Sequence, residues 1–461
     1  MNCLIFRFVL LSVLISVLLT SCSGGESGTG ITGSDPKVSV GVITGFGSVF
    51  VNGVEFDTSH AQINVNESDA TEQDLSIGMV VAVVGSADRA GVVGKADAVY
   101  YESEVRGIVS QNNQDGTLDI MGQMVKYDTE TVFESDDDTV TVIEDIPEGA
   151  VVEVSGYRTG DNTLHATHMT LVSNTYTTGA ELTVKGVVTT GLSNGKFSMG
   201  SLTIAVDSST QFVGIPNQQL TPGTVIKVKS IRGVLNNELQ ADIIESGTSD
   251  YVSVGDTVDI EGLVMNAGVT PSEFLLNGFR VYFSNQTKFN GGTASDLADG
   301  VKAEVEGMLL TQNEIEAKEI SFRQTAKLDL IAPVTSINTV DNQVDMSGVI
   351  VKLTNKTLLK DDDKTTKVKK FSLADLNEGD KVKIKAYQDN LSMEIIATQF
   401  RRVEALSLDT TFELSGVLDE LTNDQAIISG IPVDRSQITT LSSENVGSNV
   451  TIIGTTPLTI Q

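Results

Sequence analysis

The fold of this chain is decided by the stretch GFGSVFVNGVEF at residues 45–56, which is followed by DLSIGMVV at residues 74–81. In the first stretch, apolar residues alternate on both sides of Asn52-Gly53. Tight hairpins prefer this dipeptide because both turn residues adopt positive φ. In the second stretch, an acidic turn ending at Gly78 leads into β-branched residues. Together the two stretches predict a hairpin, a turn and a further strand.

Both features recur along the chain at a nearly fixed period, which indicates a repeat architecture. The turn glycines lie between 68 and 79 residues apart, at Gly78, Gly149, Gly223, Gly300, Gly379 and Gly447. The hairpin glycines are Gly53, Gly122, Gly200, Gly278, Gly348 and Gly430. We therefore expect about six copies of one small module.

Three further features mark the copies. A glycine before an apolar pair opens each copy at Gly41, Gly107, Gly186, Gly262 and Gly416, whereas the fifth copy has Ala332-Pro333-Val334 there. A Thr-x-Phe element follows the hairpin at 131–133, 210–212 and 287–289, and we expect its aromatic ring to fill the core. An alanine lies in the last strand at Ala96, Ala166, Ala241, Ala317 and Ala397.

One copy is therefore expected to contain a strand, a hairpin, a short turn or helical turn, and two more strands. Five strands in about 70 residues fit a small closed or partly open barrel of the OB type, which hides its strand edges by closure. A pair of packed sheets is the alternative. The predicted fold is all-β: a tandem array of about six OB-like, five-stranded modules after a signal peptide and a flexible tether.

The predicted boundaries follow from the repeat. They are 1–21 for the signal peptide, 22–37 for the tether, 38–105 for module 1, 106–183 for module 2, 184–258 for module 3, 259–329 for module 4, 330–410 for module 5 and 411–461 for a truncated module 6. In module 6 the last strand is either 457–460 or missing. Six modules in file would extend to roughly 150 Å.

With the copies assembled, the stretches at 45–56 and 74–81 resemble the bacterial family catalogued as domain of unknown function 5666 (DUF5666). The first copy resembles it most closely. The resemblance implies a cell-envelope setting, because lipoproteins that carry several such domains are known in that family. No activity is established for the family, so it brings no catalytic residues to this chain.

The N-terminus predicts a lipoprotein. One basic residue precedes an apolar run from Phe8 to Leu19, which has the length of a signal-peptide core and is short for a membrane-spanning helix. Leu19, Thr20, Ser21 and Cys22 then resemble the bacterial lipobox, in which the cysteine is acylated and becomes the first residue. Acyl chains on Cys22 would anchor the protein to a membrane. Ser23 favours the outer membrane by likeness to Gram-negative lipoproteins.

The composition argues against several functional classes. A net charge of −30, from 61 acidic and 31 basic residues, repels nucleic acid. We interpret the charge as a solvated surface, with attraction of divalent cations or of a basic partner as the alternative.

Only Cys3, Cys22 and three histidines are present, and the spacing of His165 and His168 points them to opposite faces of a strand. We expect core or surface histidines rather than metal ligands.

The acidic residues are interpreted as structural. The Asp that precedes the turn glycine is expected to cap nearby backbone N–H groups. The runs Asp136-Asp137-Asp138 and Asp361-Asp362-Asp363 are expected to be solvated loops, because neither has the ligand spacing of an EF-hand.

Module 5 stands apart because it is nearly neutral and rich in lysine, at Lys364, Lys367, Lys369, Lys370, Lys381, Lys383 and Lys385. One hypothesis is that this face docks acidic neighbouring modules or an anionic glycan. The other is that the surface of one repeat has simply drifted.

The sequence predicts a non-enzymatic structural or binding role in the cell envelope, with a polysaccharide or an envelope protein as the partner. No catalytic residue, metal site or cofactor is expected, because no constellation of nucleophile, base or metal ligands recurs in the copies. The alternative is a hydrolase whose paired carboxylates lie in a groove between modules.

Overall fold

The computed structural model describes residues 35–88, 90–135, 137, 139–215, 219–247, 251–363, 367–403, 411–435, 441–442 and 445–455. The predicted signal peptide, the lipobox with Cys22 and nearly all of the tether lie outside these ranges. The described chain is almost entirely β-structure, joined by turns and 3-10 helices, and contains no α-helix. None of its helices is long and apolar enough to cross a membrane.

Module 1 is a closed barrel of five main strands. Its elements are β1 (Asp35–Gly45), β2 (Val49–Val51), β3 (Val54–Asp57), β4 (Gln62–Val65), β5 (Ser68–Ala70), η1 (Glu72–Asp74), β6 (Val80–Ala87) and β7 (Val93–Tyr101). Antiparallel pairing joins β1 to β2, β2 to β3, β7 to β6 and β6 to β1. The circle closes because β3 and β7 pair in parallel, which is the strand order expected of an OB-like barrel.

Modules 2, 4 and 5 repeat this order. Module 2 consists of β8 (Val105–Asn112), β9 (Thr117–Ile120), β10 (Gln123–Lys126), β11 (Val132–Ser135), η2 (Ile143–Asp145), β12 (Val151–Arg158) and β13 (Leu164–Ser173). Module 4 consists of β23 (Thr257–Met265), β24 (Glu273–Leu276), β25 (Phe279–Tyr282), β26 (Lys288–Asn290), η4 (Ala294–Asp296), β27 (Lys302–Thr311) and β28 (Glu314–Phe322). Module 5 consists of β29 (Leu328–Asn338), β30 (Gln343–Met346), β31 (Val349–Lys352), β32 (Leu358–Asp361), η5 (Leu373–Asp375), β33 (Lys381–Gln388) and β34 (Ile395–Val403).

Modules 3 and 6 vary the pattern. The long strands of module 3 are interrupted, which gives β14 (Leu182–Val187), β15 (Thr190–Ser193), β16 (Lys196–Met199), β17 (Leu202–Ala205), β18 (Gln211–Val213), β19 (Val225–Ser230), β20 (Val234–Leu235), β21 (Glu238–Gln240) and β22 (Ile243–Ser246). Module 6 has β35 (Thr411–Leu421), β36 (Gln425–Ile428), β37 (Ile431–Asp434) and β38 (Asn449–Thr455). The predicted last strand at 457–460 lies outside the described residues.

The repeated turn glycine has the same role in all six modules. Its φ lies between +84° and +92° in every copy, a conformation that side chains disfavour. Its N–H donates to a carbonyl of the first strand, or in module 3 of the residue directly after β14, in six equivalent hydrogen bonds of 2.8–2.9 Å: Gly78 to Ile43, Gly149 to Val109, Gly223 to Val188, Gly300 to Val264, Gly379 to Val334 and Gly447 to Leu418. The carbonyl of the following residue accepts a hydrogen bond in return. This pair of bonds fastens the turn to the first strand and helps to close each barrel.

The other repeated residues are also structural. In modules 2 to 5 a buried or half-buried threonine donates from Oγ1 to the carbonyl of the last-strand alanine, as in Thr131 to Ala166 at 2.9 Å. The aromatic ring of the same element, which was expected to fill the core, is only half-buried at Phe133, Phe212 and Phe289. The expected capping by the turn aspartate is confirmed in three modules: Asp74 with Thr71, Asp296 with Thr293 and Asp375 with Ser372.

The modules pair through their first strands. In modules 1 to 5 the first strand begins one to three residues before the predicted module boundary, and its N-terminal half extends beyond the hairpin. That half carries an uncovered edge, which pairs with the first strand of another module. The pairs are β1 with β23 in parallel, β8 with β14 antiparallel, and β29 with β35 antiparallel.

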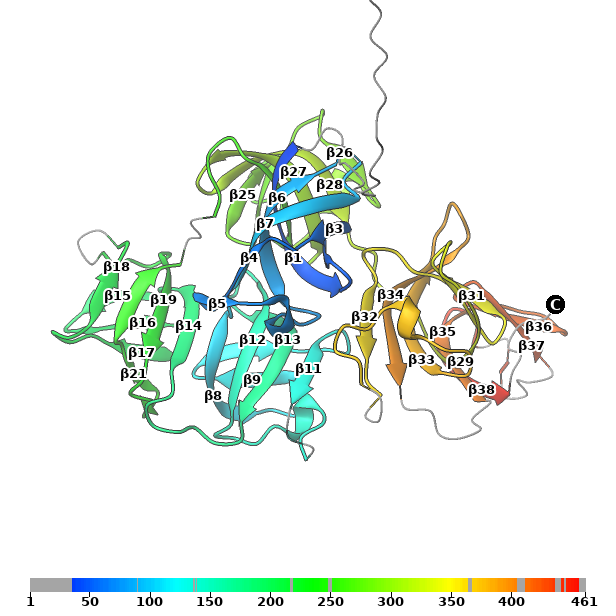
Figure 1. Ribbon diagram of the computed structural model, residues 1–461, viewed down its shortest axis with the longest axis horizontal. Coiled ribbons are helices and arrows are strands. Elements are labelled where there is room, and N and C mark those ends of the chain that lie inside the picture. The colour runs from blue at the N-terminus through cyan, green and yellow to red at the C-terminus, as the bar shows by residue number, and fades with distance from the viewer. Residues whose placement is uncertain are drawn as a thin grey trace, which may run out of the picture.

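The resulting body is gathered around module 1 rather than strung out in file, which corrects the extended arrangement considered from the sequence. Figure 1 shows the blue strands of module 1 in the centre, with modules 2, 3, 4 and 5 around them. Val38 and Val40 of β1 pack into the core of module 4. On another side, His168 of module 2 lies with Nδ1 2.8 Å from the carbonyl oxygen of Ile77.

We expect Gly78→Ala to destabilise the protein more than Gly149→Ala. Both glycines have nearly the same φ, +89° and +88°, so both substitutions carry a left-handed strain of about 1–2 kcal/mol. A Cβ at Gly78 would also lie 2.7 Å from the carbonyl oxygen of Thr167 in module 2, whereas a Cβ at Gly149 meets open space. Thermal unfolding of both variants measures the difference, and equal losses would contradict this packing of module 1 against module 2.

Candidate functional site

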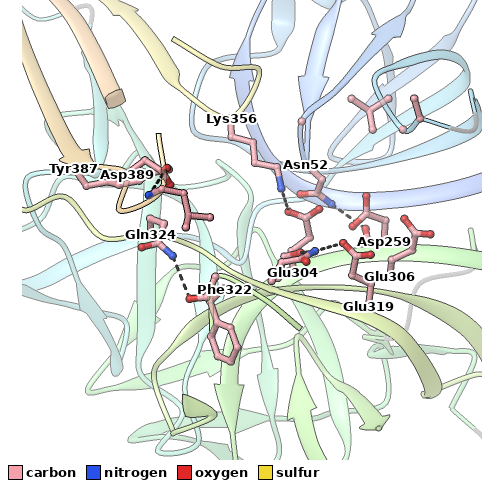
Figure 2. Close-up of a pocket in the computed structure, with 18 of the residues that line it drawn as sticks. Asn52, Asp259, Glu304, Glu306, Glu319, Phe322, Gln324, Lys356, Tyr387 and Asp389 are labelled. Carbon is pink, nitrogen blue, oxygen red and sulfur yellow. Dashed lines mark hydrogen bonds and ion pairs between the residues drawn. The ribbon is translucent and has the colours of Figure 1, made fainter. Parts of the chain in front are cut away.

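A large cleft lies where modules 1, 4 and 5 meet. It has a volume of about 820 Å³ and is open to solvent. Figure 2 shows residues from all three modules around it: Asn52 from module 1, Asp259, Glu304, Glu306 and Glu319 from module 4, and Lys356, Tyr387 and Asp389 from module 5. A second cleft of about 430 Å³ shares Gly53, Phe322, Gln324, Lys356 and Tyr387 with it. The site therefore depends on the packing of the modules and does not belong to any one barrel.

The floor of the cleft is the parallel junction of β1 and β23. Lys37 on β1 and Asp259 on β23 form a buried ion pair, with Nζ 3.0 Å from Oδ2. The same Nζ lies 3.4 Å from Oε2 of Glu306, so the two carboxylates share one ammonium group. Asp259 is only 2% exposed, and its other oxygen, Oδ1, has no hydrogen-bond partner among the described residues.

Asn52 lies over this junction, and its orientation is fixed. Its Nδ2 donates to the carbonyl oxygens of Val40 at 3.1 Å and of Asp259 at 3.0 Å. Because carbonyls only accept, the amide cannot be flipped, and Oδ1 is left as an acceptor without a partner among the described residues. Gly41 makes room for this side chain, because a Cβ there would lie 2.0 Å from Oδ1 of Asn52.

Charge and burial perturb the groups at this junction. Burial, and after it the nearby Glu304 carboxylate, raise the pKa of Asp259 to about 7. Burial acts to lower the pKa of Lys37, but the Asp259 and Glu306 carboxylates outweigh it, and the pKa of Lys37 is raised. Lys37 is therefore charged at neutral pH, while Asp259 lies near its titration midpoint.

Module 5 closes the cleft with a second ammonium group. Nζ of Lys356 lies 2.7 Å from Oε2 of Glu304 in module 4. The neighbouring Asn355 joins the same module to module 1, because its Nδ2 donates to the carbonyl of Gly53 at 3.1 Å and its own carbonyl accepts from Oγ1 of Thr44 at 2.7 Å. These contacts fix module 5 as one wall of the cleft.

A buried ionic network lies under the adjoining cleft. Glu261 of β23 is 1% exposed and contacts Arg323, Lys302 at 3.1 Å and the hydroxyl of Tyr157 in module 2 at 3.0 Å. Burial alone would raise its pKa, but Arg323 and Lys302 lower the pKa of Glu261 to about 2. Asp259 and Glu261 lie two positions apart on one strand, yet the pKa of Asp259 is raised and the pKa of Glu261 is lowered.

The remaining sequence predictions have mixed outcomes. His60 is exposed, His165 is half-buried and His168 is buried, as expected of surface and core histidines. The expectation of a solvated loop is wrong for Asp361, which is 2% exposed and accepts a hydrogen bond from Nε of Arg402 at 3.0 Å. A partner far along the chain explains the error. Asp136 and Asp138 lie outside the described residues.

Two of the lysines that mark module 5, Lys369 and Lys370, contact module 1, and Lys364 lies outside the described residues. Lys370 pairs with Glu72 of module 1, and Lys369 donates to the carbonyl of Gln73 at 2.5 Å. Lys385 instead pairs with Asp329 of its own module at 3.2 Å. Docking of a neighbouring module is therefore found at Lys369 and Lys370.

Sequence reasoning missed the residues that form the cleft. The sequence predicts Asn52 only as a turn residue and places Lys37 in the tether. In the run Thr257-Val258-Asp259-Ile260-Glu261, the alternation suggests a solvent-facing side for the two acids, yet both are buried between modules. Charged residues inside a strongly β-branched strand are the one signal that could have drawn attention to this face.

Comparison with known protein families identifies the modules. The family described as "Domain of unknown function (DUF5666)" matches residues 106–170, 185–245, 264–321 and 332–399, which together make up more than half of the chain. The chain belongs to this family. The four matches fall in modules 2 to 5, so the expectation that module 1 is the closest copy is not supported. Module 1 differs from the DUF5666 modules by its additional β4–β5 hairpin.

Other comparisons add little. Among solved structures, the chain is similar to one described as "drosophila Unr CSD456", with 12% identity over 49% of this chain and 97% of that chain, and a TM-score of 0.12. A TM-score this low does not support a comparison of the two folds. A comparison with curated proteins found no match.

We expect the stability of the Asp259→Asn variant to increase relative to that of the natural protein as the pH rises from 5 to 8. A carboxyl group with a raised pKa favours the folded state when it is protonated, and this contribution is lost as the pH rises through about 7. The asparagine cannot lose a proton. The melting temperature of the variant should therefore gain about 2–4 °C on the natural protein over this range.

Glu238→Gln is the matched control for this titration. Glu238 forms an ion pair with Lys196 on the surface of module 3, far from the junction, and both side chains are substantially exposed. It should show no such pH-dependent gain. A constant difference for Asp259→Asn across the same pH range would contradict the raised pKa.

Proposed function

We propose that this protein is a lipid-anchored cell-envelope protein that binds a ligand in the cleft between modules 1, 4 and 5 without converting it chemically. The observation that carries the proposal is the composite cleft, whose floor holds two buried acceptor oxygens without partners among the described residues. Unsatisfied buried acceptors are costly, so their persistence at a cleft favours a ligand that donates hydrogen bonds to them.

The anchor is proposed from the sequence. Acylation of Cys22 would attach the chain to the outer membrane, and the segment between Cys22 and Lys37 would reach on the order of 20 Å. Lys37 lines the cleft, so the binding site would lie close to the membrane surface. This placement suits a partner that belongs to the envelope.

A polysaccharide or an envelope protein is the proposed ligand class. Side-chain amides line the cleft at Asn52, Asn290, Gln324, Gln388 and Asn390, and rings line it at Phe322 and Tyr387. Planar amides, carboxylates and aromatic faces supply the directed hydrogen bonds and apolar contact that orient a ligand in a pocket.

A hydrolase is the second candidate. The observation that favours it is the grouping of acids in a groove between modules, where Asp259, with its raised pKa, shares Lys37 with Glu306. A carboxyl group that titrates near pH 7 beside a second carboxylate has the properties of a general acid. Release of new reducing ends from a bound polysaccharide would favour this candidate over simple binding.

We expect a photo-crosslinking residue at Asn390, which is exposed at the rim of the cleft, to capture an envelope partner in intact cells. The matched control carries the crosslinker at Leu235, which is 75% exposed on module 3. Adducts should form from position 390 and not from position 235. In a Cys22→Ala form the protein should leave the membrane fraction and the adduct should be lost. Equal capture from both positions would contradict the cleft as the binding site.

A further inference from the structure

The cleft carries more negative than positive side chains. Asp259, Glu304, Glu306, Glu319 and Asp389 line it, against Lys37, Lys327 and Lys356. Several acids are partly balanced: Glu304 by Lys356, Glu306 by Lys37, and Glu319 by Lys288 at 3.1 Å. Asp259 is the one of these five that is buried, and half of its carboxylate is left without a partner among the described residues.

The two unpartnered atoms restrict the chemistry of the ligand. Asp259 Oδ1 and Asn52 Oδ1 belong to side chains that are 2% and 4% exposed, and both residues line the cleft. Figure 2 shows Asp259 between Asn52 and Glu306. Asn52 Oδ1 only accepts hydrogen bonds, and so does Asp259 Oδ1 when the carboxyl group is ionised, which is the form that a bound cation favours; a cationic donor therefore satisfies both atoms. An anionic group would be repelled.

Two lysine side chains of the protein already place primary ammonium groups beside the acids of the cleft. Lys37 reaches Asp259 and Glu306, and Lys356 reaches Glu304 from a different module. An alkylammonium group has three donors on a compact charge, which matches several separate acceptors. The positions of these two lysines therefore show that the cleft stabilises primary ammonium groups, including one that a ligand would carry.

A chain of spaced amines fits the cleft better than a metal ion. In the part of the chain that the structure describes, no three Asp, Glu, His or Cys side chains come together closely enough to hold a metal ion. The carboxylates are instead spread along the cleft from the β1–β23 junction to β28 and module 5. Spaced charges of this kind complement a ligand whose positive charges are also spaced.

We infer that the β1–β23 junction at Asp259 and Asn52 is a subsite for a protonated primary amine, and that the cleft binds a chain that carries several such groups. The inference rests on the proposed function, because it names the ligand class of the same cleft. Two sources supply this chemistry: an amino-sugar chain with free amines, and a linear polyamine.

Isothermal titration calorimetry of the chain without its signal peptide and lipid tests the inference. The probes are a glucosamine hexamer, its fully N-acetylated counterpart, and spermidine. The two hexamers differ in the amine alone, so we expect the free-amine hexamer to bind and the acetylated one to bind at least tenfold more weakly. Spermidine binding without hexamer binding would assign the source to a free polyamine and would also support the amine subsite.

Variants locate the subsite. Asp259→Asn removes the buried charge and should weaken binding of the amine probe at least tenfold. Glu306→Gln, at a side chain that is 49% exposed, tests the same cleft with little risk to folding and should also weaken binding. Glu238→Gln makes the same change of charge on module 3 and should leave binding unchanged.

Two results would overturn the inference. If the acetylated hexamer bound as tightly as the free amine, the ligand would be recognised by its hydroxyl groups, and the proposed binding function would stand without the amine subsite. If the cationic probes failed to bind, or if Asp259→Asn and Glu306→Gln had no more effect than Glu238→Gln, the subsite would be refuted. Crosslinking from position 390 would still test, independently of the amine subsite, whether the cleft binds an envelope partner.

Discussion

The arrangement of this protein depends on the uncovered edge of each first strand. A closed barrel removes its edges only where every strand has two neighbours, and here the first strand is longer than the hairpin strand beside it. The overhanging N–H and C=O groups need partners. They find them in the first strand of another module, and the modules are thereby joined as 1 with 4, 2 with 3, and 5 with 6. The apolar clusters follow the same grouping, since modules 2 and 3 share one core and modules 5 and 6 share another.

The pairing of β1 with β23 also creates the candidate site. The core of module 4 contains Val38 and Val40 of β1 and Val258 and Ile260 of β23. Because side chains alternate along a strand, the residues next to these four point to the opposite face. Lys37, Asp259 and Glu261 are consequently brought together at the boundary of several modules, where none is fully solvated. A backbone interaction between distant repeats therefore places ionisable groups in a cleft that no single barrel could form.

Much of the barrel could be predicted from the sequence because its signals are local. Asn52-Gly53 and the turn at Gly78 specify conformations within a few residues, and the structure confirms both. The pairing of modules could not be predicted in this way, because edge pairing uses backbone groups that every residue carries. Likewise, Asp361 and Arg402 are far apart in sequence, and the burial of Asp259 depends on a strand more than two hundred residues away.

Small-angle X-ray scattering of the chain without signal peptide and lipid tests most directly whether edge pairing gathers the modules. A body folded around module 1 should have a radius of gyration near the value for a compact chain of this length, about 22 Å, increased by a few ångströms for its lobes. Six modules in file would give about 40 Å, the value for a rod of roughly 150 Å. A radius of gyration near 40 Å, with an elongated scattering profile, would contradict the pairing of β1 with β23.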